Sequence, residues 1–186
     1  MTEAVVIRTL AIREHDRLAV LYCRDQGRIA AIARGSLRPT SRQAVALDDG
    51  NIIRCRLQPG RTGTPVLTGA QAERSWANAK RSPLAWAVAS FFLEIIDAAV
   101  YDGQPDEALW DALTESLALL DNEREDPLII LRHGQSRLLD VLGYGTQSAP
   151  TGIGAVRTSL DDQFERIVQR RLDSIGLVYQ VAAGRR

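Results

Sequence analysis

The chain has 186 residues, 45% of them hydrophobic, and its 23 basic residues equal its 23 acidic ones. That length and apolar content suffice for one domain or two small ones with a buried core. No apolar stretch approaches the roughly 18 residues needed to span a bilayer, and the opening residues lack the pattern of a signal peptide, so we expect a cytoplasmic protein with no membrane partner.

The first 75 residues predict a small β-barrel. Stretches rich in Val, Ile and Leu, or alternating between polar and apolar residues, predict five strands, at 3–10, 17–24, 27–34, 51–59 and 64–69. Five short strands with a basic outer face are typical of an OB-like barrel, which binds nucleic acid through a sheet face and flanking loops. An SH3-like barrel would give almost the same pattern.

After Trp76 the hydrophobic period changes from two to 3.6, which predicts a helical domain over 76–186. Three helices are expected to begin at Pro83, Pro105 and Pro127, and a fourth to follow a capping-box-like sequence at 159–162 and to stop at Gly176. Residues 144–158 are rich in Gly, Ser, Thr and Pro, so we expect a mobile loop there. The predicted fold class is α+β, with a five-stranded OB-like barrel followed by an all-α domain.

Residues 34–42, which follow the third predicted strand, carry three arginines and three hydroxyl groups. Guanidinium groups donate two parallel hydrogen bonds to phosphate, and hydroxyl groups can add more. An ordinary solvated connector is the alternative interpretation, because short basic runs are common. The candidate phosphate ligands in this segment are Arg34, Ser36, Arg38, Thr40, Ser41 and Arg42.

The distribution of charge favours a polyanionic ligand for the first half. Residues 1–81 hold 13 arginines and one lysine against seven acids, a net charge of +7, and residues 82–186 hold nine bases against 16 acids, a net charge of −7. Such an asymmetry between halves is a hint of nucleic-acid binding. Arg54 and Arg56 lie on one face of the fourth predicted strand and complete the set of candidate DNA contacts, although they could equally form an ordinary solvent face.

Patterns typical of catalysis or of metal binding are not found in the sequence. His15 and His133 fall in different predicted domains without a nucleophile motif, and the acids between 121 and 126 have the pattern of a solvated turn. Cys23 and Cys55 are two isolated thiols on predicted strands, which favours buried hydrophobes over a disulfide or a zinc site. We therefore expect no enzyme activity, no metal and no cofactor.

Several segments resemble, in order and spacing, the bacterial recombination mediator RecO. They are residues 3–8, 16–18 and 27–29 and above all the basic residues 34–42, which are similar to the N-terminal domain of that family. Residues 68–73 are similar to the exit from its last strand, and residues 138–144 to the helix that precedes its zinc module. The resemblance covers roughly residues 3–145.

The resemblance implies an OB-fold domain joined to a helical domain, without catalytic residues. Proteins of this kind bind single- and double-stranded DNA, anneal complementary strands, engage the acidic tail of the single-strand binding protein and the partner RecR, and help to load RecA. Many members carry four zinc-ligating cysteines after the helix that here ends at Gly143, whereas residues 144–158 contain none. The resemblance thus implies no metal here, and it leaves the role of the replacing segment open.

The residues themselves leave two functions open. In the first, the arginines follow a DNA backbone and release counterions, so that binding is independent of sequence and sensitive to salt. Base stacking should contribute little, because Tyr22 is the only aromatic residue among the first 75. In the second, the protein is an adaptor whose basic barrel docks an acidic peptide or partner.

Overall fold

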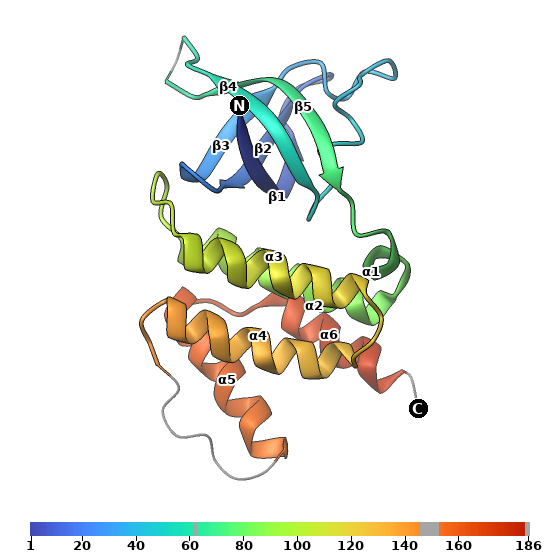
Figure 1. Cartoon of the computed structure of the whole chain (residues 1–186), viewed down its shortest axis with the longest axis vertical. Coiled ribbons are helices and arrows are strands. Elements are labelled where there is room, and N and C mark those ends of the chain that lie inside the picture. Colours follow the sequence, from blue (N-terminus) through green and yellow to red (C-terminus); the bar gives the residue numbers. More distant parts are fainter. Residues whose placement is uncertain (62, 146–152, 185–186) are drawn as a thin grey trace. The chain divides into compact units, whose positions relative to one another are not determined.

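The computed structural model describes residues 1–61, 63–145 and 153–184 (Figure 1). The first part is a closed barrel in which the strand order is β1-β2-β3-β5-β4, and all neighbours are antiparallel except β3 and β5. This order defines an OB-like barrel, which confirms that prediction over the SH3-like alternative. The strands are β1 (Thr2–Ala11), β2 (Arg17–Cys23), β3 (Gly27–Ala33), β4 (Ile52–Gln58) and β5 (Val66–Arg74).

Every second residue along each strand points into the barrel, and these inward side chains are mostly small or branched. Its buried core includes Ala4, Ala19, Ala31, Ile53 and Leu67 from the five strands. Small residues on β1, β2 and β3 suit the narrow interior of a five-stranded barrel, where large side chains on every strand would not fit. The strands fall where the sequence predicts them, except that β5 continues beyond the predicted 64–69 and Arg74 still pairs with Ile52.

The chain divides into two compact units that are not continuous in sequence. The barrel unit contains Met1–Ser75 and also Val100–Asp106, and the helical unit contains Trp76–Ala99 and Glu107–Arg186. We call Val100–Asp106 the strap. The sequence places the strap in the helical domain, but Gly103 donates to the carbonyl of Arg28 at 3.0 Å, and the Tyr22 hydroxyl donates to the carbonyl of Asp106 at 3.2 Å. The strap therefore belongs to the barrel.

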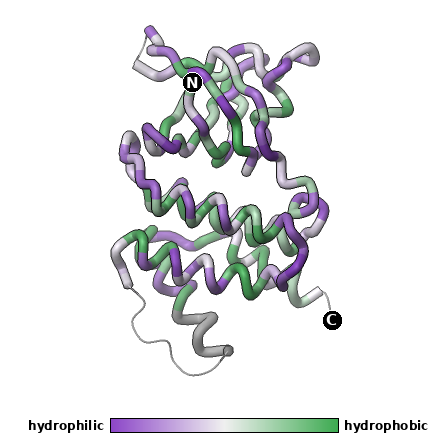
Figure 2. Tube along the Cα trace, in the orientation of Figure 1, coloured by the Kyte–Doolittle hydropathy of each residue, from purple (hydrophilic) through white to green (hydrophobic). Residues whose placement is uncertain are grey.

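The helical unit packs amphipathic helices that alternate hydrophobic and hydrophilic residues along their length (Figure 2). In α2, ten apolar side chains are buried, and the rings of Phe91 and Phe92 lie edge to face with centroids 5.5 Å apart. Phe91 meets Phe164 of α5 in the same way at 5.4 Å. The helices are α1 (Ala77–Arg81), α2 (Pro83–Ala99), α3 (Glu107–Asp121), α4 (Pro127–Val141), α5 (Ile153–Val168) and α6 (Asp173–Ala183).

Local signals predict the starts of α2 and α4 well. Asp126 caps α4, because its carboxylate accepts from the Leu128 amide at 2.8 Å and Pro127 occupies the first turn. The start predicted at Pro105 is two residues early, because Pro105 and Asp106 belong to the strap and α3 begins at Glu107.

The prediction of one fourth helix ending at Gly176 is wrong. The segment forms two helices, α5 and α6, separated by a break at Gln169, whose φ is 54°. Glu94 on α2 causes the second start, since its carboxylate accepts from the Ser174 amide at 3.0 Å and from the Ser174 hydroxyl at 2.5 Å. A cap supplied 80 residues away cannot be read from the local sequence, and α6 then runs through Gly176.

The mobile loop predicted over 144–158 overlaps α5. The backbone is already helical from Ile153, so the last part of that prediction is wrong. Residues 146–152, the middle of the predicted loop, lie outside the described residues. In the described part of the chain, no helix is both long and apolar enough to cross a membrane.

Candidate nucleic-acid interface

Three loops meet at one end of the barrel, which we call the loop end. Arg17 at the start of β2 pairs with Ala11 at the end of β1 and with Ala33 at the end of β3. The Ile32 amide donates to the carbonyl of Pro65, just before β5, at 2.8 Å. The β1–β2 loop (12–16), the β3–β4 loop (34–51) and the β4–β5 loop (59–65) therefore all open at this end (Figure 1).

The first part of the β3–β4 loop, residues 34–42, is the basic loop. Gly35 adopts a φ of +63°, a conformation that glycine takes without a Cβ penalty. The Gly35 amide donates to Asp16 Oδ1 at 2.8 Å, and the Leu37 amide donates to the His15 carbonyl at 3.0 Å. Two turn bonds follow, from the Arg38 amide to the Gly35 carbonyl and from the Ser41 amide to the Arg38 carbonyl. The basic loop is thus held by its own turns and by the β1–β2 loop.

The second part of the same loop is built into the barrel. Ala46 and Leu47 are buried members of the barrel core. Asn51, also buried, donates through Nδ2 to the carbonyls of Val45 at 3.0 Å and Ala46 at 3.2 Å. The basic loop is therefore anchored on both sides, and the arginines stand on a backbone that ligand binding need not order, which lowers the entropic cost of binding.

Arg34, Arg38 and Arg42 are exposed, and within the described residues their guanidinium groups form no ion pair or hydrogen bond. The Arg38 side chain folds back over Gly35, where its Cδ would lie 3.6 Å from a Cβ. Three unpaired cations without an acid between them in the sequence attract polyanions, and each guanidinium group can donate two parallel hydrogen bonds to a phosphate or a carboxylate. The structure brings these three predicted residues together.

The three predicted hydroxyl groups have different surroundings. Ser36 is fully buried, and its hydroxyl donates to the Ala33 carbonyl at 2.8 Å, so its prediction as a surface DNA ligand is wrong. Ser41 is half-buried, and its Oγ accepts from the Gln43 amide at 3.3 Å. Thr40 is exposed beside Arg42 and stays a candidate contact. The serines shape the loop, because their short side chains bond to nearby backbone groups.

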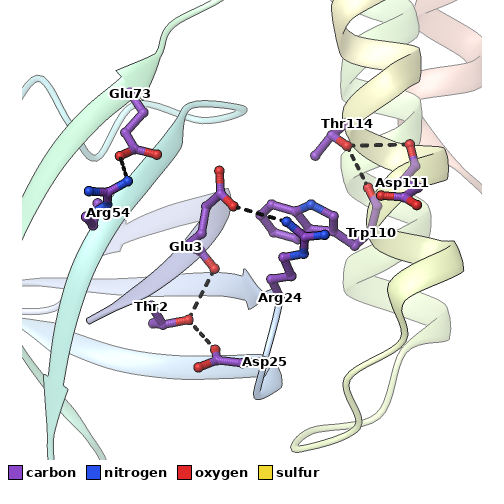
Figure 3. A network of polar contacts seen from close by, with 9 residues as sticks. All are labelled: Thr2, Glu3, Arg24, Asp25, Arg54, Glu73, Trp110, Asp111 and Thr114. Carbon is purple, nitrogen blue, oxygen red and sulfur yellow. Dashed lines mark hydrogen bonds and ion pairs between the residues drawn. The ribbon is translucent and has the colours of Figure 1, made fainter.

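Arg54 and Arg56 lie on the outer wall of the barrel, away from the basic loop in the strand order. Arg54 forms an ion pair with Glu73 of β5 at 2.7 Å (Figure 3). Arg56 is exposed and has no ion-pair partner among the described residues. Arg54 is partly neutralised before any ligand arrives, so the two predicted strand arginines are not equivalent.

Three further arginines at the loop end were missed by sequence reasoning. Arg13 in the β1–β2 loop has a side chain 72% exposed and lies 3.7 Å from Asp16 Oδ2. Arg17 begins β2, and Arg61 is exposed in the β4–β5 loop. Each stands alone in the sequence, and only the OB-like strand order, which brings the loops to one end, could have indicated them.

Two buried thiols and one buried phenol lie in the barrel unit, and burial keeps all three protonated at neutral pH. Burial raises the pKa of Cys55 to about 11, with a smaller contribution from the charge of Asp25. Burial also raises the pKa of Cys23, with smaller contributions from Cys55 and Asp25. Burial also raises the pKa of Tyr22 to about 12, against a smaller lowering by its backbone bond. Both thiols are free and protonated at pH 7. Among the described residues, no three His, Cys, Asp or Glu side chains are grouped to hold a metal ion.

A closed OB-like barrel with a basic, pre-formed loop end belongs to the class of OB-fold proteins, whose loops and sheet face bind oligonucleotides or oligosaccharides. Comparison with known families narrows this class. The model described as "Recombination protein O N terminal" matches residues 1–75, and the model described as "Recombination protein O C terminal" matches residues 81–152. The chain belongs to the recombination protein O family.

Curated relatives agree with this assignment. Proteins named DNA repair protein RecO from Symbiobacterium thermophilum and Desulforudis audaxviator are each 30% identical to the chain, over 76% and 83% of its length. The protein of that name from Syntrophobacter fumaroxidans is 31% identical over 77% of the chain. These alignments cover 56%, 61% and 56% of the respective relatives, so the chain spans little more than half of each.

Proposed function

We propose that the chain is a non-catalytic DNA-binding protein of cytoplasmic DNA repair and recombination, and that the barrel unit holds its DNA site. The observation that carries this proposal is the basic loop, whose backbone is held by hydrogen bonds and on which Arg34, Arg38 and Arg42 are exposed and unpaired within the described residues. Membership of the recombination protein O family supports it. Like the family resemblance, the proposal extends to single and double strands and to strand annealing.

The proposed mechanism is electrostatic positioning. The three arginines of the basic loop and Arg56 would each neutralise one phosphate, and Arg54 would add a fifth contact once it leaves Glu73. Neutralising the phosphates of two strands reduces their mutual repulsion, which favours annealing. Assistance to RecA loading together with a RecR-like protein and the tail of the single-strand binding protein is part of the proposal, without assigned docking residues.

Salt dependence of DNA binding tests the proposal. The anisotropy of a labelled single-stranded oligonucleotide would be titrated with the protein at about 50 and 200 mM salt, where counterion release has a large effect. Four phosphate contacts predict a slope of log affinity against log salt of about −2.8, and five predict about −3.5. The absence of binding at the lower salt would refute the DNA-binding proposal and favour the adaptor that docks an acidic partner.

A further inference from the structure

The helical unit contains a pocket that the proposed function does not use. Its volume is about 380 Å³, which is in the range of small-molecule sites. The pocket lies between the turn that follows α4 and the second half of α5. Its described lining residues are Tyr144, Gly145, Gln163, Arg166, Ile167 and Gln169. We call it the α4–α5 pocket.

The backbone on both sides of the pocket is set by a helix end. α4 closes with Gly143 at a φ of 82°, and the Tyr144 amide donates to the Leu139 carbonyl at 2.9 Å. These are the features of a Schellman motif, so the end of α4 fixes the backbone of Tyr144. On the other side, α5 ends before Gln169, whose φ is 54°. Residues other than glycine are uncommon in this left-handed region and are concentrated at binding sites.

Polar groups line the pocket without partners in the part of the chain that the structure describes. The side-chain amides of Gln163 and Gln169 make no hydrogen bond there, and neither does the hydroxyl of Tyr144. Arg166 donates through Nε to the Asp162 carbonyl at 3.1 Å, which leaves its two terminal nitrogens without a partner among those residues. Two amide groups and one guanidinium group therefore retain hydrogen-bonding capacity for a ligand.

The charge of the pocket favours an anion. Arg166 is the one ionised side chain among the described lining residues. The acids Asp162 and Glu165 line a neighbouring hollow, and the Glu165 carboxylate already accepts from the Leu172 amide at 3.4 Å. A guanidinium group that has no carboxylate partner can donate two parallel hydrogen bonds to a phosphate.

The remaining groups suit a nucleobase. The ring of Tyr144 gives a base a face on which to stack, and Ile167 adds apolar contact. Side-chain amides recognise the edges of bases, and glutamine pairs with N6 and N7 of adenine through two hydrogen bonds. Proteins that hold a single unstacked base combine the same two elements, a stacking surface and hydrogen bonds to the base edge. A base that carries a phosphate therefore matches the ring, the amides and the guanidinium group together.

We propose that the α4–α5 pocket binds one adenine nucleotide. The base stacks on Tyr144 and bonds to the amides of Gln163 and Gln169, and Arg166 holds the phosphate. This chemistry is shared by a free nucleotide and by a nucleotide within a strand, and the test distinguishes the two sources. The inference does not rest on the proposed function, because every described lining residue belongs to the helical unit.

Isothermal titration calorimetry of the full chain with AMP tests the proposal. We expect a dissociation constant on the order of 10–100 μM, which is ordinary for a ligand of this size. Adenosine and inorganic phosphate should each bind at least about 10-fold more weakly than AMP, because each supplies only part of the contacts. CMP should bind about 5-fold more weakly, because its smaller ring stacks over less area and has no N7.

Variants of two lining residues separate the base from the phosphate. Tyr144→Ala should weaken AMP binding about 10-fold, whereas Tyr144→Phe should keep most of the affinity because the ring remains. Arg166→Gln should weaken AMP binding about 10-fold and leave adenosine binding unchanged. Tyr101→Ala and Arg124→Gln are the matched controls, since both residues are exposed and lie outside the pocket, and they should change neither affinity.

A variant of Gln169 distinguishes a contact with the ligand from a structural role. Glycine adopts the left-handed φ of this position without a Cβ penalty, so Gln169→Gly should keep or raise the melting temperature. It should still weaken AMP binding about 3-fold, because one amide is lost. Losses of AMP affinity that follow the melting temperature across all variants would overturn the proposed contacts.

The calorimetric outcomes decide the proposal and the source of the nucleotide. Absence of AMP binding up to about 1 mM overturns the proposal, as does binding that Tyr144→Ala and Arg166→Gln leave unchanged. Displacement of bound AMP by oligodeoxyadenosine identifies a nucleotide within a strand as the ligand, and the lack of displacement identifies the free nucleotide. Arg38→Glu with Arg42→Glu should reduce DNA binding and leave AMP binding unchanged, so failure of this inference is distinguishable from failure of the proposed function.

Discussion

Strands β1, β2 and β3 pair in the same order at both ends of their outer face, but one end is covered by another segment and the other end is exposed. At the hairpin end, the strap covers Tyr22 and Arg28. At the loop end, Leu10 is nearly half exposed, and the arginines of the basic loop have no partner in the part of the chain that the structure describes. The alternation of residues along the strands does not by itself distinguish the two ends, because apolar side chains occur on the outer face at both. The strap, about 80 residues away in sequence, contacts the hairpin end and leaves the loop end uncovered.

The largest expected effect comes from disturbing the covered end. A Cβ on Gly27, whose φ is +70°, would overlap the backbone of Gln104 in the strap. We expect Gly27→Ala to lower the free energy of unfolding by about 2–4 kcal/mol, measured by urea denaturation. Gly63→Ala is the matched control, since Gly63 has a φ of +86° and open space around it, and its cost should be about 1 kcal/mol. Equal costs would mean that the strap contact contributes nothing.

Reversing charges at the open end should abolish most DNA binding without affecting folding. Arg38→Glu with Arg42→Glu replaces two attractions to phosphate by two repulsions, and we expect affinity for single strands to fall on the order of 100-fold at about 50 mM salt. The control pair Arg124→Glu and Arg171→Glu makes the same change in net charge at exposed arginines of the helical unit. Similar losses for both pairs, in the same anisotropy assay, would argue for attraction by overall charge and against a site on the basic loop.

A smaller effect should follow from releasing Arg54. Glu73 holds Arg54 in an ion pair at 2.7 Å, and Glu73→Gln removes the competing carboxylate with little change in shape. We expect affinity for DNA to rise about 2- to 5-fold and the salt slope to steepen by about 0.7, the value for one added contact. Glu125→Gln, which removes an exposed acid from the helical unit, should leave the slope unchanged. An unchanged slope for Glu73→Gln would show that the wall of the barrel does not contact DNA.

The last prediction concerns the stability of the barrel unit at alkaline pH. The pKa of Tyr22 is raised from 10 to about 12 and that of Cys55 from 9 to about 11, so the folded state keeps protons that the unfolded state has lost. Stability should therefore fall as pH rises above about 9, through the interval between the unfolded and folded pKa values. Urea denaturation at pH 7, 9 and 10.5 checks this expectation, where about 10.5 lies between the two pKa values of Tyr22.

Tyr22→Phe separates the contribution of the phenol from that of the thiols. It removes both the titrating group and the hydrogen bond to the Asp106 carbonyl. We expect about 1 kcal/mol less stability at pH 7 and a shallower decline above pH 10. A decline as steep as that of the wild-type protein would assign the alkaline loss to Cys23 and Cys55 alone.

The strands and the basic loop could be predicted because their signals are local. Alternation marks β4 through Ile53, Cys55 and the exposed Arg54 and Arg56, and a run of arginines marks the basic loop in any fold. The remaining features depend on distant residues. Ser36 is buried only once the barrel has closed. The start of α6 depends on hydrogen bonds to Glu94 of α2. The strap can lie against the barrel because Gly27 has no Cβ to overlap the backbone of Gln104.

The candidate site follows the same division. Arg34, Arg38 and Arg42 lie within nine residues of one another and were predicted together, whereas Arg13, Arg17 and Arg61 join them only through the strand order. The α4–α5 pocket could not be predicted at all, because its described lining residues come from the turn after one helix and from the end of another. Their meeting depends on how these helices pack, which no local pattern encodes.

The chain passes between its two units three times, after Ser75, after Ala99 and after Asp106. During synthesis from the N-terminus, the five strands are complete once Arg74 has left the ribosome, but the strap follows only after α1 and α2. Until then the strap cannot cover Tyr22 and Arg28 at the hairpin end of the sheet. A nascent barrel would therefore offer a longer apolar face than the finished one, and α2 must be made before that surface is covered.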